Sequence, residues 1–408
     1  MPRRRAQNGR RPYDYHCEMP MSLPTVPEML AQLVAEPSVS CSNKTFDQGN
    51  RGVTALLANW LEDLGFACEV VGIPDQPHKA NLIATLGSGP GGIVLAGHTD
   101  TVPCNAQLWQ RDPLQMHERD GQLYGLGICD MKGFFPLALT AAQAFRGAAL
   151  RAPITLLATA DEESTMAGAR QLVALDRPKA RYAVIGEPTD LRPIYAHKGM
   201  MMLSIRLRGR SGHSSNPGLG VNALDAMHAV MAALMTFRAE LAARHCHAAF
   251  EVAIPTMNLG CLHGGDSPNR ICAEAELQLD LRLVPGMNTV EVAGQLRDRV
   301  LAAAASAGVE ATIDDIFPPL DPFATAADSR FVRLCEQLTG HPAGTVSFGT
   351  EGPYLQALGM ETIVLGPGSI DQAHQPDEFL RLDRLQPTIE VLRQLIAACC
   401  TGRTDLAA

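Results

Sequence analysis

The fold of this chain is decided by Gly97-His98-Thr99-Asp100-Thr101-Val102-Pro103, which directly follows the short apolar run Ile93-Val94-Leu95-Ala96. Such a run is typical of a buried parallel strand. Parallel strands of α/β folds carry functional side chains at their carboxyl ends. Side chains two positions apart in an extended chain point to the same side, so His98 could bind a metal while Asp100 orients its ring. On local grounds alone, a hydrogen-bonded core histidine is the more common explanation of His98, and the metal interpretation depends on the rest of the chain.

Two further apolar runs end in acidic side chains in the same way. Residues 153–159 lead into Asp161-Glu162-Glu163, and residues 182–185 lead into Gly186-Glu187. Polar loops that converge at the ends of neighbouring strands are typical of an α/β active site. The sequence therefore predicts one polar cleft built from several strand ends.

The hydrophobic pattern changes near residue 200. Between 271 and 284, apolar and polar residues alternate, as in an antiparallel strand with one solvated face. Helical spacing predicts helices over about 221–243 and 288–305. A buried-strand pattern returns at 362–365, followed by a Gly-Pro-Gly-Ser loop. We expect an α/β protein with two domains. The catalytic domain, with a mixed sheet flanked by helices, takes 23–203 and 318–408, and an inserted α+β domain of one antiparallel sheet and two helices takes 204–317.

The composition excludes several classes of protein. The chain has 408 residues, 46% hydrophobic and 19% charged, which suits a globular protein with a sizeable core. Its net charge of -9 argues against nucleic acid as a partner. No apolar run approaches the roughly 18 residues of a membrane span. The eleven cysteines lack C-x-x-C spacing, which predicts reduced thiols in a cytoplasmic protein. Residues 1–22 are expected to form a disordered basic tail, with a targeting or nucleic-acid-binding arm as the alternative.

Outside the expected insert, the candidate metal ligands are His98, Asp130, Glu162, Glu163, Glu187 and His374. These nitrogen and oxygen donors suit zinc, with cobalt or manganese as alternatives. So many carboxylates would repel one another unless cations held them together, and two metals could share one carboxylate as a bridge. One of the adjacent Glu162 and Glu163 could bind metal while the other takes a proton from water. Each residue also has a simpler explanation: a solvated glutamate pair, a helix cap at Asp130, and a loop histidine at His374.

Several motifs carry a family resemblance. They are GHTDTVP (97–103), GLGICDMKG (125–133), ATADEES (158–164), IGEPT (185–189) and SGHSSNP (211–217). From about residue 25 to the last predicted helix, the chain resembles the di-zinc aminoacylase and carboxypeptidase family. Four more stretches bear on the substrate class: AHKG (196–199), HGGDSPNRIC (263–272), FGTEGPYLQ (348–356) and LGPGSIDQAHQPDEFL (365–380).

The resemblance implies a role for each metal-site residue. His98 and Glu187 would bind one metal, Glu163 and His374 the other, and Asp130 would bridge them. The expected cofactors are two Zn²⁺ per subunit, with Co²⁺ as a possible substitute. Asp100 would orient His98, Glu162 would act first as general base and then as general acid, and the Asp130–Met131 peptide would be cis.

The resemblance also implies residues that act on the substrate. His213 would polarise the scissile carbonyl in the active site of the other subunit of a homodimer, although without the family we would interpret it as a capping or loop histidine. Asn269 and Arg282 would bind the substrate, and a solvated salt bridge is the alternative for Arg282. Weaker candidates for substrate binding are Arg270, Thr350 and Glu351, whose carboxylate could meet a side-chain ammonium.

The implied activity is removal of acetyl from a small N-acyl amino acid, N2-acetyl-L-ornithine, giving L-ornithine and acetate in arginine biosynthesis. The inserted domain would form the dimer and close over the substrate, with hinges near 204 and 317. Sister activities on succinyl-diaminopimelate, dipeptides or acetylcitrulline would share every metal ligand. A non-catalytic binding protein and a metal-free structural protein are alternatives of other classes, and the complete ligand set argues against the former.

Overall fold

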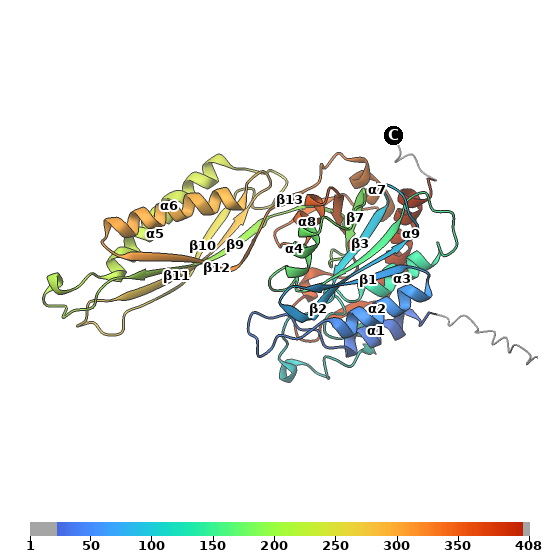
Figure 1. The fold of residues 1–408 in the computed structure, drawn as a ribbon, viewed down its shortest axis with the longest axis horizontal. Coiled ribbons are helices and arrows are strands. Elements are labelled where there is room, and N and C mark those ends of the chain that lie inside the picture. Colours follow the sequence, from blue (N-terminus) through green and yellow to red (C-terminus); the bar gives the residue numbers. More distant parts are fainter. Residues whose placement is uncertain (1–22, 403–408) are drawn as a thin grey trace, which may run out of the picture.

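The computed structural model describes residues 23–402, so the basic tail expected over 1–22 lies outside the described residues. A nine-stranded sheet has the order β1-β2-β6-β3-β7-β15-β8-β13, with β14 paired to β8 (Figure 1). Its strands are β1 (Ala67–Ile73), β2 (Gln76–Leu86), β3 (Ile93–His98), β6 (Ile154–Thr159), β7 (Tyr182–Ile185), β8 (Ile194–His197), β13 (Phe323–Ala324), β14 (Gly344–Val346) and β15 (Glu361–Val364). The central β6, β3, β7 and β15 are parallel, while β1 and β2 pair antiparallel at one edge. This is the expected mixed sheet.

Helices cover both faces of the large sheet, which explains why β3, β6 and β7 are buried along their whole length and mostly apolar. They are α1 (Val26–Ala35), α2 (Arg51–Asp63), α3 (Phe134–Gln143), α4 (Ala167–Ala174), α7 (Arg330–Thr339), α8 (Gly352–Ala357) and α9 (Leu385–Cys400). Leu95 packs with residues of α2, α3 and α9 on one face. Val94 and Ala96 pack with residues of α4 and α8 on the other. Both faces of β3 are therefore covered, and only its carboxyl end is left for chemistry.

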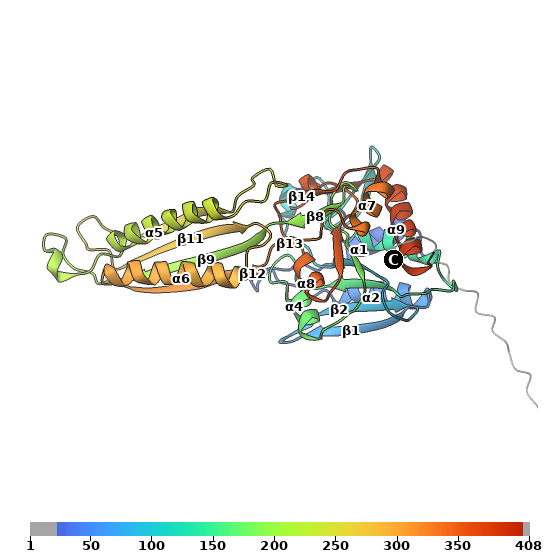
Figure 2. The ribbon, with the colours of Figure 1, turned by 90° about the horizontal axis from the view of Figure 1, so that it is seen from above.

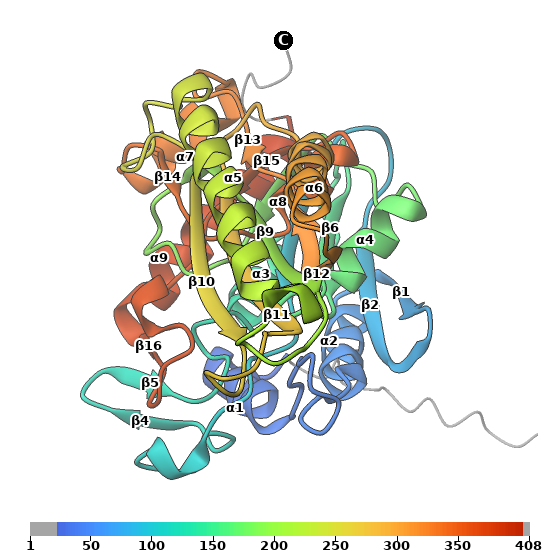
Figure 3. The ribbon, with the colours of Figure 1, turned by 90° about the vertical axis from the view of Figure 1, so that its left-hand side faces the viewer.

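A second, antiparallel sheet has the order β10-β11-β9-β12 and its own hydrophobic core. Its elements are β9 (Gly199–Arg208), α5 (Ala223–Arg244), β10 (Thr256–Gly264), β11 (Glu274–Leu283), α6 (Thr289–Ser306) and β12 (Glu310–Leu320). Figures 1 and 2 show this sheet and its two helices as an elongated lobe that projects from the nine-stranded sheet, and Figure 3 views the molecule from the lobe's end. Leu277, Leu279 and Leu281 of β11 face the helices, as the alternation predicts.

The chain passes between the two sheets at Lys198 and again near Asp321. The strands of the second sheet thus span 199–320, a few residues beyond the expected insert at each end, because β9 and β12 continue toward the large sheet. The division into two domains, with a hinge at these crossings, stays a proposal.

The remaining elements are short. A three-stranded sheet contains β4 (His117–Arg119), β5 (Gln122–Tyr124) and β16 (Phe379–Arg381), and the 3₁₀ turns are η1 (Ala106–Leu108), η2 (Pro217–Leu219), η3 (Ile370–Gln372) and η4 (Leu382–Arg384). Within residues 23–402, no helix has the length and apolar character needed to cross a membrane. The cysteines of the same range are free thiols.

Candidate active site

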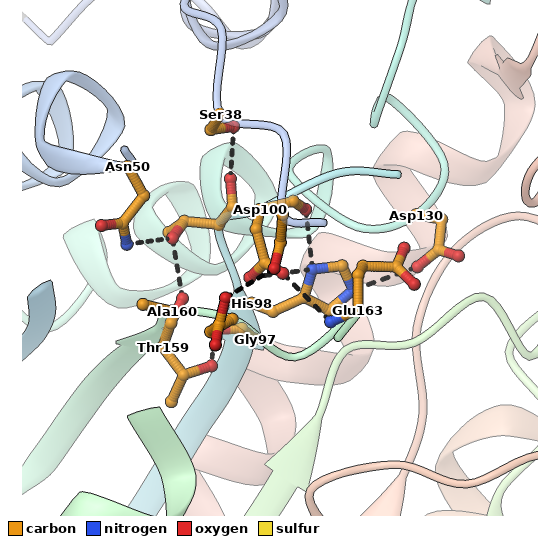
Figure 4. Close-up of polar contacts among 12 residues, drawn as sticks. Ser38, Asn50, Gly97, His98, Asp100, Asp130, Thr159, Ala160 and Glu163 are labelled. Atoms are coloured by element: carbon orange, nitrogen blue, oxygen red, sulfur yellow. Dashed lines mark hydrogen bonds and ion pairs between the residues drawn. The ribbon is translucent and has the colours of Figure 1, made fainter. Parts of the chain in front are cut away.

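His98 is the last residue of β3, and its ring is almost completely buried. Its Nδ1 lies 2.9 Å from the backbone oxygen of Asp100 and 3.8 Å from the Asp100 carboxylate. Asp100 therefore contacts the ring mainly through its carbonyl, which leaves Nε2 free to face the site. The Asp100 carboxylate accepts the backbone N–H of Glu163 at 3.0 Å instead. Figure 4 shows the His98 ring between Asp100 and Asp130.

Side chains around Thr99 fix the segment that follows His98. Ser38 Oγ donates to the Thr99 carbonyl at 2.7 Å, Asn50 Nδ2 donates to the Thr99 hydroxyl, and that hydroxyl donates to the carbonyl of Thr159 (Figure 4). All of these side chains are buried. The end of β3 is therefore attached both to the neighbouring strand β6 and to the helices at the start of the chain.

Asp130 lies in the loop before α3 and uses its two oxygens differently. Oδ1 is 3.2 Å from His98 Nε2, and Oδ2 is 3.5 Å from His374 Nε2. Glu187, just after β7, brings Oε1 to 3.7 Å from the same His98 nitrogen, whereas Glu163 brings both oxygens to 3.1 Å from His374 Nε2. The structure thus forms two histidine–carboxylate pairs with Asp130 between them. The Asp130–Met131 peptide is cis, as expected.

These residues fit a metal cofactor. One donor atom each from His98, Asp130 and Glu163 lies within 4.8 Å of the others. Imidazole nitrogen and carboxylate oxygen are suitable donors for zinc or cobalt. The chain therefore has a candidate metal-binding group.

Glu162 lies beside this group, half-buried, and lines a cavity of about 260 Å³ together with Met200, Met202 and Phe317. Burial raises the pKa of Glu162 well above its ordinary value; the positive charge of His98 opposes this rise, and the neighbouring Glu187 and Glu163 add to it. A carboxyl group whose surroundings favour its protonated form can hold a proton taken from water, as a general base must before it acts as an acid.

The predicted substrate-binding residues do not come together within one chain. Arg282 lies at the end of β11 near the large sheet, paired with Met200 of β9. Asn269 precedes the opposite end of β11, and the eight positions from Glu274 to Arg282 span about 26 Å of strand. His213 is exposed and forms a β-bridge with Arg270, so it also lies at the far end.

Arg282 has the salt bridge that the sequence left open for it, and Arg270 also pairs with a carboxylate. Arg282 Nε donates to Asp280 at 3.0 Å, and both side chains are about 30% exposed. Arg270 pairs with Asp266. Thr350 and Glu351, by contrast, are fully buried beside the metal-binding group, and burial raises the pKa of Glu351 to about 7.

Three supporting residues were missed by sequence reasoning. Lys79 of β2 forms a buried ion pair with Asp161, the residue that precedes Glu162 and Glu163 in the sequence. The Asp161 carboxylate also accepts a hydrogen bond from Ser40 Oγ at 2.6 Å. Glu378 accepts backbone N–H groups of the Asp130 loop. His197 joins the end of β8 to the backbone of Thr350. His197 lies in the AHKG motif, and Glu378 lies in the QPDEF part of LGPGSIDQAHQPDEFL. No hydrophobic periodicity indicates what either side chain contacts.

Comparison with known proteins places this geometry in a family. The model of peptidase family M20/M25/M40 matches residues 94–398. The chain belongs to peptidase family M20/M25/M40. Acetylornithine deacetylase of Photorhabdus laumondii is 44% identical to this chain over 382 residues, which cover 94% of this chain and 99% of that protein. Acetylornithine deacetylase of Proteus mirabilis is 45% identical over 94% of this chain and 98% of its own length.

Solved structures of the M20 family share the fold. A Bacillus subtilis protein described as a dinuclear metal-binding M20 peptidase has a TM-score of 0.64 at 15% identity, covering 91% of this chain and 97% of its own. Such identity speaks for the fold alone. The expected architecture, a mixed-sheet catalytic region with an additional α+β region, is confirmed as that of an M20 protein.

Proposed function

We propose that this M20 protein is a metal-dependent acetylornithine deacetylase, which hydrolyses N2-acetyl-L-ornithine to L-ornithine and acetate in arginine biosynthesis. The observation that carries the proposal is the arrangement of two histidine–carboxylate pairs around Asp130, in a chain similar over 94% of its length to proteins of that name. His98, Glu187 and Asp130 would hold one Zn²⁺, and His374, Glu163 and Asp130 the other, with Co²⁺ as a substitute. When bound, the metals would supply Lewis acidity and a water of lowered pKa.

The chain's own residues would carry the proton. Glu162 would accept it from the attacking water as the bond to the acetyl carbon forms. Glu162 would then donate it to the ornithine nitrogen as the amide C–N bond breaks, so that the side chain ends in its starting state. Its raised pKa favours holding the proton between these two steps. Asp100 would fix both His98 and the backbone of Glu163, which keeps the base beside the ligands.

Substrate binding would require two subunits. Because His213 and Asn269 lie far from the metal-binding group of their own chain, we propose that they serve the active site of the partner in a homodimer. There His213 would polarise the acetyl carbonyl. Arg282 would bind the substrate carboxylate, Thr350 would line the pocket, and the buried Glu351 would meet the side-chain ammonium. Arg270, paired with Asp266, would act only after leaving that partner.

The decisive experiment is acetate release from N2-acetyl-L-ornithine, with succinyl-diaminopimelate, acetylcitrulline and a dipeptide as competing substrates, with and without a chelator. We expect chelator-sensitive turnover that favours acetylornithine. Preference for another of these substrates would keep the mechanism and change the assigned activity. No hydrolysis of any of them by metal-loaded protein would overturn the proposal.

A further inference from the structure

We propose that Glu378 is a positioning residue of the metal centre, which fixes the loop of Asp130 to the segment of His374. This inference rests on the proposed metal-dependent function. Glu378 is only 3% exposed and follows His374 by four residues. Its side chain reaches a loop 248 to 251 positions earlier in the chain.

Three backbone amides converge on the Glu378 carboxylate. Oε1 accepts the N–H groups of Cys129 at 2.7 Å and of Asp130 at 3.0 Å, and Oε2 accepts the N–H of Gly127 at 2.9 Å. No backbone carbonyl among the described residues accepts these three N–H groups. Buried amides without a partner are costly, so this loop depends on an acceptor supplied from elsewhere.

The backbone of Glu378 adds a second attachment. Its carbonyl accepts the N–H of Gly125 at 3.1 Å, and the strand that follows, β16, pairs with β5 just before the loop. Both ends of the 125–130 segment are therefore tied to residues 378–381. Asp130 cannot shift along this contact without breaking hydrogen bonds to Glu378.

The two attached segments carry ligands that must keep a fixed spacing. Asp130 Oδ2 lies 3.5 Å from His374 Nε2, yet His374 is itself half-exposed. Its backbone has φ +60°, and η3 precedes it. An exposed ligand on a loop depends on how the segment that carries it is anchored, and Glu378 anchors this segment to the Asp130 loop four residues after His374. Partners of this kind that hold metal ligands are typically worth 10- to 100-fold in metal affinity.

A carboxylate suits this position better than an amide. When ionised it is acceptor-only and offers about four lone-pair sites, and the three N–H donors favour this ionised form against the burial that raises the pKa of Glu378 to about 8. Glutamine would keep the size and one acceptor oxygen, but its NH₂ group would face an amide N–H of Gly127 or of the Cys129–Asp130 pair. Glu378→Gln should therefore loosen the loop without opening a cavity.

The test compares Glu378→Gln with Glu336→Gln in the full chain. Glu336 is a suitable control because its Oε1 accepts the N–H of Ala343 at 2.8 Å, at the end of α7. Metal-stripped proteins are titrated with Zn²⁺ against a chromophoric chelator, and Co²⁺-loaded samples are compared by visible absorption. We expect Glu378→Gln to weaken binding of at least one metal 10- to 100-fold and to change the Co²⁺ spectrum, and Glu336→Gln to match the unmodified protein.

Three results separate the possible failures. A folded Glu378→Gln protein with unchanged Zn²⁺ affinity and Co²⁺ spectrum overturns the inference, even if its metal-free form melts earlier. If the unmodified chain binds no metal, the proposed function fails instead. If Glu378→Gln does not fold, Glu378→Asp replaces it: this variant keeps the carboxylate but cannot reach all three amides, so unchanged affinity there also overturns the inference.

Discussion

Glu162 and Glu163 are adjacent in sequence but differ in their contacts. Both carboxylate oxygens of Glu163 lie 3.1 Å from His374 Nε2, and the backbone N–H of Glu163 donates to the Asp100 carboxylate. Glu162 has no hydrogen-bonded side-chain partner among the described residues and faces the cavity lined by Met200 and Met202. Neighbouring side chains on a turn point in different directions, and this divergence would let Glu163 act as the proposed ligand while Glu162 stays free.

Glu162→Gln tests this difference. The amide cannot accept a proton, so we expect kcat to fall by about 10²- to 10⁴-fold. Metal content should stay unchanged, because the paired ligands remain. Acetate release and metal analysis would measure both quantities, with the exposed Glu62→Gln as a control for the substitution itself. Turnover close to that of the control would remove Glu162 from the role of base.

His197 predicts a pH dependence of stability. It is fully buried, with Nδ1 2.9 Å from the Lys198 carbonyl and Nε2 3.2 Å from the Thr350 amide N–H, so the ring is neutral. Burial lowers its pKa to about 4, below the value of about 6.5 in an unfolded chain. The unfolded state therefore binds a proton first, and stability is lost as the pH falls from about 6.5 toward 4.

His197→Gln should reduce this dependence. Unfolding by urea at pH 7 and at pH 5 would show a smaller difference in free energy for this variant than for the unmodified protein. His228→Gln, at an exposed position on α5, should retain the full difference. Equal pH dependence in all three proteins would mean that His197 does not resist protonation.

At the scale of elements, the turn after β6 depends on a buried ion pair. Asp161 has a left-handed backbone (φ +69°) and accepts side-chain hydrogen bonds from Lys79, Ser40 and Ser164. Lys79 comes from β2, the antiparallel neighbour of β6. The direction of Glu162 is therefore set by a strand that carries no ligand.

Lys79→Met removes the charge that balances Asp161. Both side chains are at most 5% exposed, and breaking a buried pair costs about 3–5 kcal/mol. We expect a loss of that size in the free energy of unfolding, measured with urea. Lys179→Met breaks an exposed pair with Asp176 and should cost less than about 1 kcal/mol. Similar losses for both variants would contradict the assigned role of Lys79.

Elements were more predictable than the contacts between them. The apolar runs indicated β3, β6 and β7, and the alternation indicated β11, because burial on two faces or on one leaves a direct trace in composition. Strand ends then indicated where His98, Glu162 and Glu187 would lie. Glu378 and Lys79 left no such trace, since their partners are backbone amides and a distant carboxylate. The alternation over 271–284 already separated Asn269, before the strand, from Arg282 near its end, but no pattern showed which end of β11 lies toward the large sheet.

At the scale of the whole molecule, the projecting lobe separates His213 from the metal-binding group of its own chain (Figure 2). The β-bridge between His213 and Arg270 holds this histidine at the lobe's far end. A homodimer in which each lobe reaches the other subunit would complete two sites at once. This arrangement makes a specific prediction for mixed subunits.

His213→Ala and Glu162→Gln should each be poorly active alone and should regain activity when mixed. One site of a hybrid dimer would combine an intact Glu162 with an intact His213 from the partner, so up to half of the hybrid's sites would work. Acetate release by hybrids isolated with two affinity tags measures this. Verified hybrids that are no more active than the parents would place His213 outside the partner's site.

The order of the proposed ligands along the chain has a consequence for biosynthesis. His98, Asp130 and Glu187 all lie in the first half of the sequence, whereas His374 and Glu378 lie near its end. A ribosome would therefore release one ligand group long before the other. The first proposed metal position would begin to form during translation, but the second would wait until residues 374–378 leave the exit tunnel. Loading with both proposed metals would therefore follow the synthesis of this late segment.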